Sequence, residues 1–175
     1  MWYNIYNHFT KLLISTFTEN LNTLQRLLNE SQGTFIHFGN ELYRFTKQSD
    51  ISLEEIAHFE KKHQIQLPDT FKTFLTTLGA CTLFENERGF AYEFYPPSQW
   101  ESFTNEVFNG TGTNLFPQVI LVCYPNGGHQ AGFITTQTDA FGTFYSDIPP
   151  EYWEEDTELT SFANWLNEEI SLCLL

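Results

Sequence analysis

The chain has 175 residues, of which 41% are hydrophobic, including 18 Phe, 8 Tyr and 4 Trp. This composition excludes an intrinsically disordered protein, and the length fits one domain with a single core. The formal net charge of −14 creates a negative field that repels nucleic acid and anionic membranes, so a basic protein is the partner expected instead.

The acidic charge is concentrated in the second half of the chain. All eight Lys and Arg residues lie at or before Arg88, together with ten Asp and Glu. Residues 89–175 contain twelve Asp and Glu and no Lys or Arg. Because both halves are expected within one domain, we expect this asymmetry to appear as a charged surface and not as a separate tail.

Cysteine spacing and hydropathy indicate the compartment. The chain has three cysteines, far apart and without a C-x-x-C motif, which predicts free buried thiols and no disulfide framework or zinc site. No apolar run reaches the ~18–20 residues of a membrane span. The N-terminus lacks the basic start and small-residue cleavage site of a signal peptide. We therefore expect a cytoplasmic protein. The cysteines are Cys81, Cys123 and Cys173.

The first half of the chain predicts three helices and a hairpin. Leucines at helical spacing predict a helix over residues 2–28, broken near residues 16–18. Two β-rich runs, 34–38 and 41–45, flank a Gly39-Asn40 turn and predict a hairpin. A second helix is expected at residues 52–63, where Ser52 and Glu55 form a capping box. A third is expected from Pro68 to a left-handed stop at Gly79. Its buried residues are Phe71, Phe74, Leu75 and Leu78.

The second half predicts four strands and two helices, with a turn at residues 126–128. The continuous apolar run at 119–124 is typical of a central strand covered on both faces. The other expected elements are strands at 90–95, 132–136 and 142–145, a helix with a Ser98/Glu101 capping box, and a last helix from Thr160 that buries Phe162, Trp165, Leu166 and Ile170. This order predicts an α+β fold in which helices pack against a central, mostly antiparallel sheet.

Several blocks in this order resemble the SUKH superfamily, over roughly residues 50–175. They are the I-x-x-F-E block at 56–60, the L-P-x-x-F block at 67–71 with Phe74-Leu75 and Leu78-Gly79, the apolar strand that ends at Tyr124 before 125–128, and the closing helix at 161–166. The resemblance implies an α+β domain with a central sheet. It also implies an immunity protein that blocks a bacterial toxin, or a regulator of cell-wall assembly as in fungal relatives.

The resemblance does not cover residues 1–49, which we expect to form an N-terminal extension of helices and a hairpin packed on the core. The turn after Tyr124 also differs from the commoner family pattern, because Asn126 and His129 stand where an Asp is often found. The family motif itself has a structural explanation, since Leu67 and Pro68 fix the start of a helix whose phenylalanines fill the core. These residues indicate the family and not the binding site.

An acidic run interleaved with aromatic residues is the candidate partner-binding site. Its carboxylates could pair with Lys and Arg of a basic toxin, while its two aromatic rings could act as apolar anchors. The alternative is a solvated loop and helix start, where acidic residues are also favourable. The residues are Asp147, Glu151, Tyr152, Trp153, Glu154, Glu155, Asp156 and Glu158.

No pattern predicts a catalytic residue, a metal site or a cofactor site. His58 and His63 are five residues apart, so they do not place two ligands on one helix face. The chain lacks an EF-hand loop, a G-x-S-x-G motif and a P-loop. The missing motifs argue against an enzyme, and the SUKH resemblance implies an immunity protein that neutralises a cognate toxin by stoichiometric binding. The alternatives are a regulatory or scaffold protein, and a small hydrolase with paired carboxylates.

Overall fold

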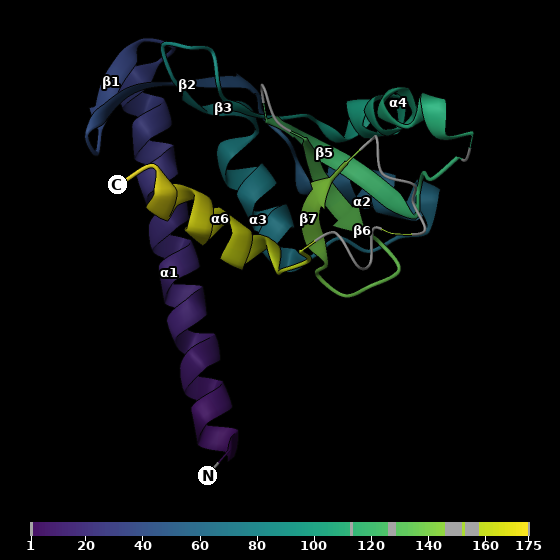
Figure 1. Cartoon of the computed structure of the whole chain (residues 1–175). Coiled ribbons are helices and arrows are strands. Elements are labelled where there is room, and N and C mark those ends of the chain that lie inside the picture. Colours follow the sequence, from purple (N-terminus) through teal and green to yellow (C-terminus); the bar gives the residue numbers. More distant parts are fainter. Residues whose placement is uncertain (1, 113, 126–128, 146–151, 153–157, 175) are drawn as a thin grey trace.

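The protein is built around one seven-stranded antiparallel sheet whose strands follow in chain order (Figure 1). The computed structural model describes the backbone of residues 2–112, 114–125, 129–145, 152 and 158–174, and side chains within these ranges from Thr16 onward, apart from Thr111. The expected α+β fold with an antiparallel sheet is confirmed. The strands are β1 (Phe35–Phe38), β2 (Glu41–Ser49), β3 (Ala80–Glu85), β4 (Tyr92–Phe94), β5 (Val119–Pro125), β6 (Gln130–Ile134) and β7 (Phe141–Phe144).

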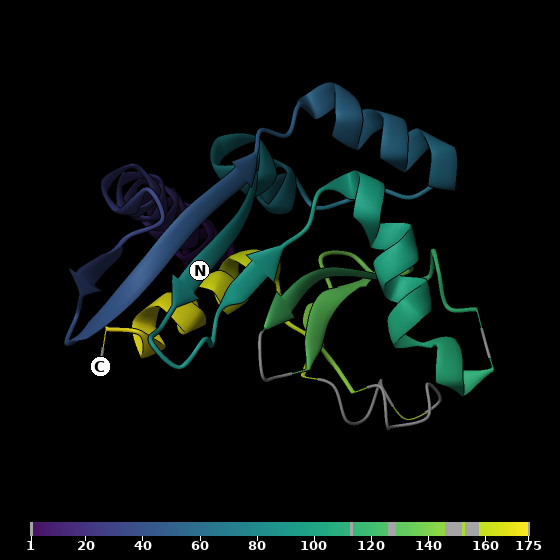
Figure 2. The ribbon, with the colours of Figure 1, turned by 90° about the horizontal axis from the view of Figure 1, so that it is seen from above.

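Helices cover both faces of this sheet. Helices α1, α3 and α6 pack beneath it, whereas α4 packs on the opposite face over β5, and α2 lies between α3 and α4 (Figures 1 and 2). Figure 1 also shows the N-terminal half of α1 extending past the body. The helices are α1 (Trp2–Ser31), α2 (Leu53–His63), α3 (Asp69–Leu78), α4 (Pro97–Val107), the 3-10 turn η1 (Asn109–Thr111) and α6 (Phe162–Leu172).

Phenylalanine rings fill the main core between the sheet and the lower helices. Phe74 of α3 is fully buried, and its ring centroid lies 4.6 Å from that of Phe94 on β4 and 5.1 Å from that of Phe162 on α6. Aromatic pairs at these separations stabilise a fold beyond the area they bury. A second, smaller cluster lies under α4 and consists of Phe108, Leu115, Val119, Leu121 and Phe144. Strand β5 is therefore covered on both faces, as its apolar run predicts.

Helix α1 is continuous, so the predicted break near residues 16–18 is wrong. Phe17, Leu21, Leu24 and Leu28 are buried at helical spacing through and beyond this region. The low helix propensity of Thr costs only tenths of a kcal/mol, which the burial of one such side chain, about 1.5–3 kcal/mol, exceeds. The hairpin formed by β1 and β2 pairs directly with β3 in the same sheet. The division of the chain at residue 49 stays a prediction.

One predicted capping box is confirmed and the other is wrong. Ser52 caps α2: its hydroxyl accepts from the Glu55 backbone N–H at 3.2 Å, and the Glu55 carboxylate accepts from the Ser52 N–H at 2.7 Å. Helix α4 instead begins one residue before Ser98, with Pro96 at the N-cap and Pro97 in the first turn, and no side chain caps it. Proline has a preset φ and no N–H to satisfy, which suits this position.

Gly79 ends α3, but not through the predicted left-handed stop. Its φ is +79° and its ψ is −167°, so the chain leaves the helix extended and enters β3 at once. A Cβ at this position would collide with the backbone carbonyl oxygen of Ser49, so the close approach of β2 also requires glycine. The sequence pattern does not predict β3. It does predict β4, which spans fewer residues than the expected 90–95.

Two buried hydroxyl groups fix helices to the sheet. The Ser31 hydroxyl at the end of α1 accepts from the Phe45 backbone N–H of β2 at 2.9 Å. The Thr104 hydroxyl of α4 accepts from the Leu121 N–H of β5 at 2.9 Å, and Thr104 is fully buried. Each side chain supplies an acceptor to a buried strand N–H that would otherwise be costly to leave unpaired.

Replacing Phe74 by Ala tests the main core. We expect Phe74→Ala to lower the free energy of unfolding by about 3–5 kcal/mol, because burial is lost and a cavity remains. Chemical denaturation measures this loss. Phe90→Ala is the matched control, since Phe90 is 51% exposed and its loss should cost much less. A loss below about 1 kcal/mol at Phe74 would contradict the described core.

Replacing Thr104 by Val tests the attachment of α4. Thr104→Val keeps the size of the side chain but leaves the Leu121 N–H without its acceptor, so we expect a loss of about 1–3 kcal/mol in unfolding free energy. Thr76→Val, at an exposed position of α3, is the control and should change stability by less than about 0.5 kcal/mol. Equal effects of the two substitutions would show that the hydroxyl does not hold α4.

Candidate partner-binding surface

An open hollow of about 700 Å³ lies between strand β7 and helix α6, and we call it the β7–α6 hollow. Three carboxylates line it, from Glu158, Glu168 and Glu169, together with the aromatic side chains of Tyr145 and Trp165. Among the described residues, no Lys or Arg side chain lines it. The hollow therefore combines negative charge with aromatic surface, a combination that suits cationic side chains.

Backbone contacts hold the segment that enters α6 against the outer edge of β7. Phe141 and Thr160 exchange backbone hydrogen bonds of 2.8 and 2.9 Å. The Ser161 hydroxyl then caps α6 by accepting from the Asn164 N–H at 3.2 Å. The Asp139 carboxylate accepts from the Phe162 N–H at 3.1 Å. The pKa of Asp139 is raised because burial outweighs this hydrogen bond. These contacts set the position of α6 and of Glu158 just before it.

Helical spacing places the acidic residues of α6 beside Trp165. Glu168 and Glu169 follow Trp165 at i+3 and i+4, so the three residues share one face of the helix. Trp165 is 8% exposed and its ring lies 4.8 Å from that of Phe141 on β7. The Tyr92 hydroxyl donates to the Glu169 carboxylate. Burial and this carboxylate raise the pKa of Tyr92, so Tyr92 stays protonated and Glu169 is held in place, while Glu168 is exposed.

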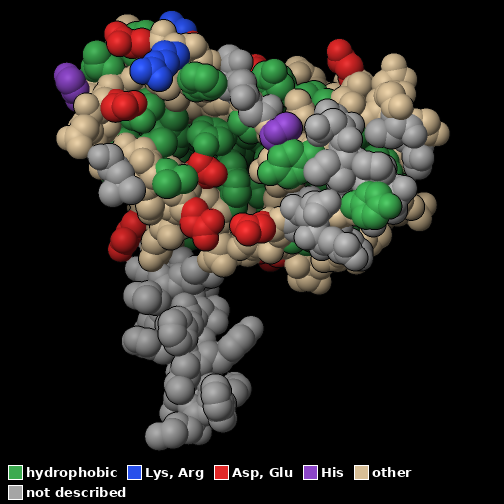
Figure 3. All heavy atoms as spheres, in the orientation of Figure 1, with side chains coloured by type: hydrophobic (Ala, Val, Ile, Leu, Met, Phe, Trp, Pro, Cys, Tyr) green, Lys and Arg blue, Asp and Glu red, His purple; other side chains and the backbone are tan. Residues whose placement is uncertain are grey.

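The negative charge of the second half of the chain is largely uncompensated. In the described part of the chain, the ion pairs of Lys and Arg join them to acidic residues before residue 89, except for the pair between Lys62 and Glu101. Figure 3 shows Asp and Glu side chains along α6 and Lys and Arg side chains at the upper end of the same face, over β2 and β3. The field of this face is therefore negative beside the hollow.

The structure describes two of the eight residues predicted to bind a partner. Glu158 is exposed and lines the hollow, whereas Tyr152 is 52% exposed and is not among the residues that line it. The role of the run stays a prediction, because its other members lie outside the described residues: Asp147, Glu151, Trp153, Glu154, Glu155 and Asp156.

The sequence analysis missed three residues that line the hollow, Tyr145, Glu168 and Glu169. Glu168 and Glu169 follow Trp165 by three and four residues in a predicted helix, so the sequence could have indicated that they share a helix face with Trp165. Nothing in the sequence places Tyr145 there, since this depends on the packing of α6 along β7.

Within the described ranges, no group of three or more His, Cys, Asp or Glu residues is placed to hold a metal ion. Burial raises the pKa of Cys81 to about 12 and that of Cys123 well above its usual value. Both thiols are therefore poor nucleophiles, because the thiolate is the reactive form. No helix in these ranges is both long enough and apolar enough to cross a membrane.

Comparison with known proteins identifies the family. Residues 50–169 match the family model of the SMI1 / KNR4 family (SUKH-1). The chain is also 33% identical over 146 residues to a protein of Dickeya dadantii (strain 3937) named immunity protein RhsIB, and the match covers 82% of this chain and 88% of that protein. The expected SUKH resemblance is confirmed, and the chain belongs to the SMI1 / KNR4 family (SUKH-1).

Proposed function

We propose that this protein is an immunity protein that binds a cognate protein toxin and neutralises it by stoichiometric occupation of its surface. The observation that carries the proposal is the match to immunity protein RhsIB along nearly the whole length of both chains. The match is longer than the segment 50–169 that the family model covers. The similarity therefore extends beyond the core that all family members share.

The charge distribution supports a basic toxin as the partner. The carboxylates of the β7–α6 hollow lack compensating cations among the described residues, so a basic surface gains favourable Coulomb energy as it approaches. Complementary charge of this kind raises association rates and rejects acidic competitors. The same field disfavours nucleic acid and anionic membranes as partners. The acidic run at residues 147–158 would extend the attracting surface.

The proposed mode of action is non-enzymatic and takes place in the cytoplasm. The three cysteines are free thiols, of which Cys81 and Cys123 are buried as predicted and Cys173 is only partly buried, and free thiols suit a reducing compartment. Neutralisation by binding requires only that the complex outlasts the toxin's contact with its target. Residence time is set mainly by packed contacts, whereas steering charges mainly set the rate of encounter.

Neutralisation should follow one-to-one stoichiometry. With the cognate toxin domain as partner, we expect calorimetry to give a single site and residual toxin activity to fall to zero near equimolar immunity protein. Binding alone accounts for such a profile. Protection at a small fraction of the toxin concentration, sustained over time, would indicate turnover and contradict the proposal.

Neutralising the hollow's exposed carboxylates should slow association. We expect the double substitution Glu158→Gln and Glu168→Gln to lower the association rate on the order of 3–10-fold at low salt, a part of the roughly 10–1,000-fold that steering can supply. The rate should also depend less on salt, because screening has less attraction to remove. Stopped-flow kinetics at several ionic strengths measures both effects.

The matched control carries the same change of net charge elsewhere. Glu87 and Glu106 are exposed and line none of the hollow, so Glu87→Gln with Glu106→Gln should change the association rate much less. Equal rates for the two double variants would show that the hollow does not lie near the bound toxin. An increase confined to the dissociation rate would place the carboxylates at the centre of the contact.

A further inference from the structure

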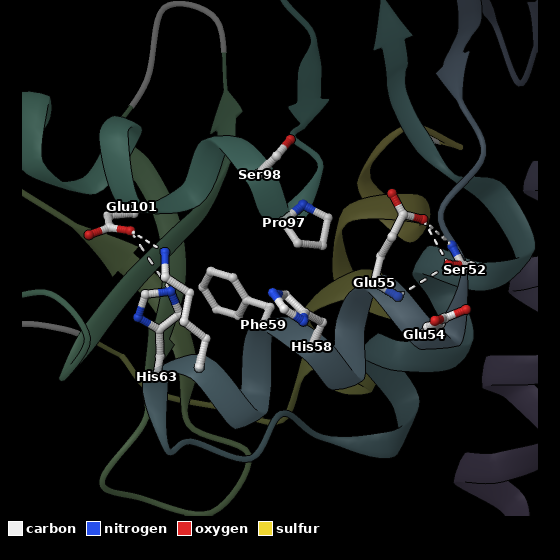
Figure 4. A pocket seen from close by; sticks show the side chains of 10 residues that line it. Ser52, Glu54, Glu55, His58, Phe59, His63, Pro97, Ser98 and Glu101 are labelled. Atoms are coloured by element: carbon white, nitrogen blue, oxygen red, sulfur yellow. Dashed lines mark hydrogen bonds and ion pairs between the residues drawn. The ribbon is translucent and has the colours of Figure 1, made fainter.

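A second recess lies on the other side of the fold, between α2 and α4, with a volume of about 460 Å³ (Figure 4). We call it the α2–α4 groove. The ring of Phe59 forms its apolar centre, next to Pro97 at the start of α4. Glu54 and Glu55 line the end near the start of α2, while Glu101 reaches from α4 to the opposite end (Figure 4). None of these residues belongs to the acidic run or to the β7–α6 hollow.

The groove is formed before any partner binds. The Trp100 indole N–H donates to the Tyr95 carbonyl oxygen at 2.7 Å, and Thr104 accepts from β5, so α4 is attached to the sheet at two successive turns. Helix α2 is fixed by its capping box and by the burial of Ile56 and Phe59. Rigid walls lower the ordering cost that a binding partner must meet.

His63 presents an unsatisfied polar atom to this groove. The side chain is only 10% exposed, and its ring packs 4.5 Å from Phe59 and 4.8 Å from Phe116. Its Nε2 atom is buried and has no hydrogen-bond partner among the described residues. The nearest carboxylate oxygen, on Glu101, lies 3.8 Å away, too far for a hydrogen bond. Such an atom gains free energy when a ligand supplies a partner.

The groove carries a net negative charge, because His63 is uncharged and does not offset its carboxylates. Burial lowers the pKa of His63, the positive charge of Lys62 lowers it further, and Glu101 opposes both effects only in part. The imidazole is therefore neutral at pH 7 and offers one acceptor nitrogen. Hydrogen bonds from Ser52 lower the pKa of Glu55, which stays ionised. The three carboxylates that line the groove then face a single cation, Lys62.

The ion pair across the groove is easily exchanged. Lys62 Nζ lies 3.2 Å from Glu101 Oε2, and the two side chains are 58% and 47% exposed. Exposed pairs of this kind contribute little to stability, so an incoming cation can replace Lys62 at low cost. An arginine side chain is favoured in this exchange, since its planar guanidinium can bind a carboxylate through two parallel hydrogen bonds.

We propose that the α2–α4 groove binds an extended, arginine-containing segment of the toxin. The arginine pairs with Glu101, a neighbouring apolar side chain packs on Phe59, and a backbone group of the segment forms a hydrogen bond with His63 Nε2. The proposal rests on the proposed function and names a second contact that it does not require. Charge complementarity selects this occupant, because an acidic segment would meet Glu54, Glu55 and Glu101 with only Lys62 to offset their charge.

The first test compares Glu101→Gln with Glu106→Gln in the full-length chain. Both residues are exposed carboxylates of α4, but only Glu101 lines the groove. We expect Glu101→Gln to raise the Kd for the toxin domain on the order of 10-fold, as expected for the loss of one charge-assisted hydrogen bond. Most of this change should come from faster dissociation. Glu106→Gln should stay within about 2-fold of the wild type. Thermal denaturation confirms that both variants remain folded.

The second test needs no toxin. A capped hexapeptide that alternates arginine and leucine is titrated into the protein while the imidazole proton signals are followed by NMR. We expect the signals of His58 and His63, which line the groove, to shift, and that of His37 on β1 to stay unchanged. Glu101→Gln should abolish the shifts. A peptide with aspartate in place of arginine should cause none.

The outcomes separate the two proposals. If Glu101→Gln and Glu106→Gln bind the toxin equally well, and the groove histidines of the wild-type chain do not respond to the arginine peptide, the groove proposal is overturned and the proposed function stays intact. A wild-type chain that does not bind the toxin overturns the proposed function and, with it, the identity of the groove's occupant.

Discussion

The contact among three phenylalanine rings, Phe71, Phe74 and Phe162, connects two helices of this fold, α3 and α6, that lie far apart in the sequence. Phe71 and Phe74 come from α3, whereas Phe162 opens α6, and the ring centroids of both α3 residues lie about 5 Å from that of Phe162. All three side chains are fully buried. Because α6 is fixed at its first residue by this contact, the residues that follow along the helix are brought beside β7. The acidic hollow is therefore a consequence of the core.

The separation of acidic from basic residues is the second constraint. It lowers the stability of the fold through repulsion among acidic side chains, and the core must offset this loss. Like charges along α6 and around the hollow repel one another, and the described ion pairs give them little relief. The large aromatic core offsets such self-repulsion, since truncating one buried aromatic side chain to Ala costs about 3–5 kcal/mol of unfolding free energy. Unpaired charge that the fold tolerates is available to a partner, which explains why it can serve recognition.

Local sequence signals predicted the elements that depend on neighbouring residues. The Ser52/Glu55 capping box, the Gly39-Asn40 hairpin turn and the buried face of α3 all follow from patterns within a few positions. The Ser98/Glu101 capping box was wrong because Pro97 is itself a better first residue of the helix, which moves the start of α4. Glu101 is thereby released from a local role and is free to reach Lys62 across the groove.

Features that join distant segments could not be predicted. Strand β3 begins directly after Gly79 and its burial does not alternate along the strand, so its pairing with both β2 and β4 is decided by packing and not by a period in its own residues. The α2–α4 groove combines residues about 40 positions apart, so no motif spacing indicates it. His63 illustrates the limit: its sequence context is an ordinary helix end, and its ring packs against Phe116, from a distant segment, as well as against Phe59 of its own helix. The acidic run, by contrast, is visible in the sequence because its members are adjacent.

The hollow and the groove would act over different distances. Coulomb attraction from the carboxylates along α6 extends to about 10 Å at 0.1 M salt, so it acts before contact and on any basic protein. The groove acts only on contact, since Phe59 and His63 exert no long-range force. Attraction alone gives little discrimination among basic partners, whereas a buried polar atom without a hydrogen-bond partner disfavours a binding partner that leaves it unpaired. An immunity protein must bind its own toxin in preference to other basic proteins of the cell. In the proposed immunity role, a steering surface combined with a preformed groove would meet this requirement without requiring the fold to change shape.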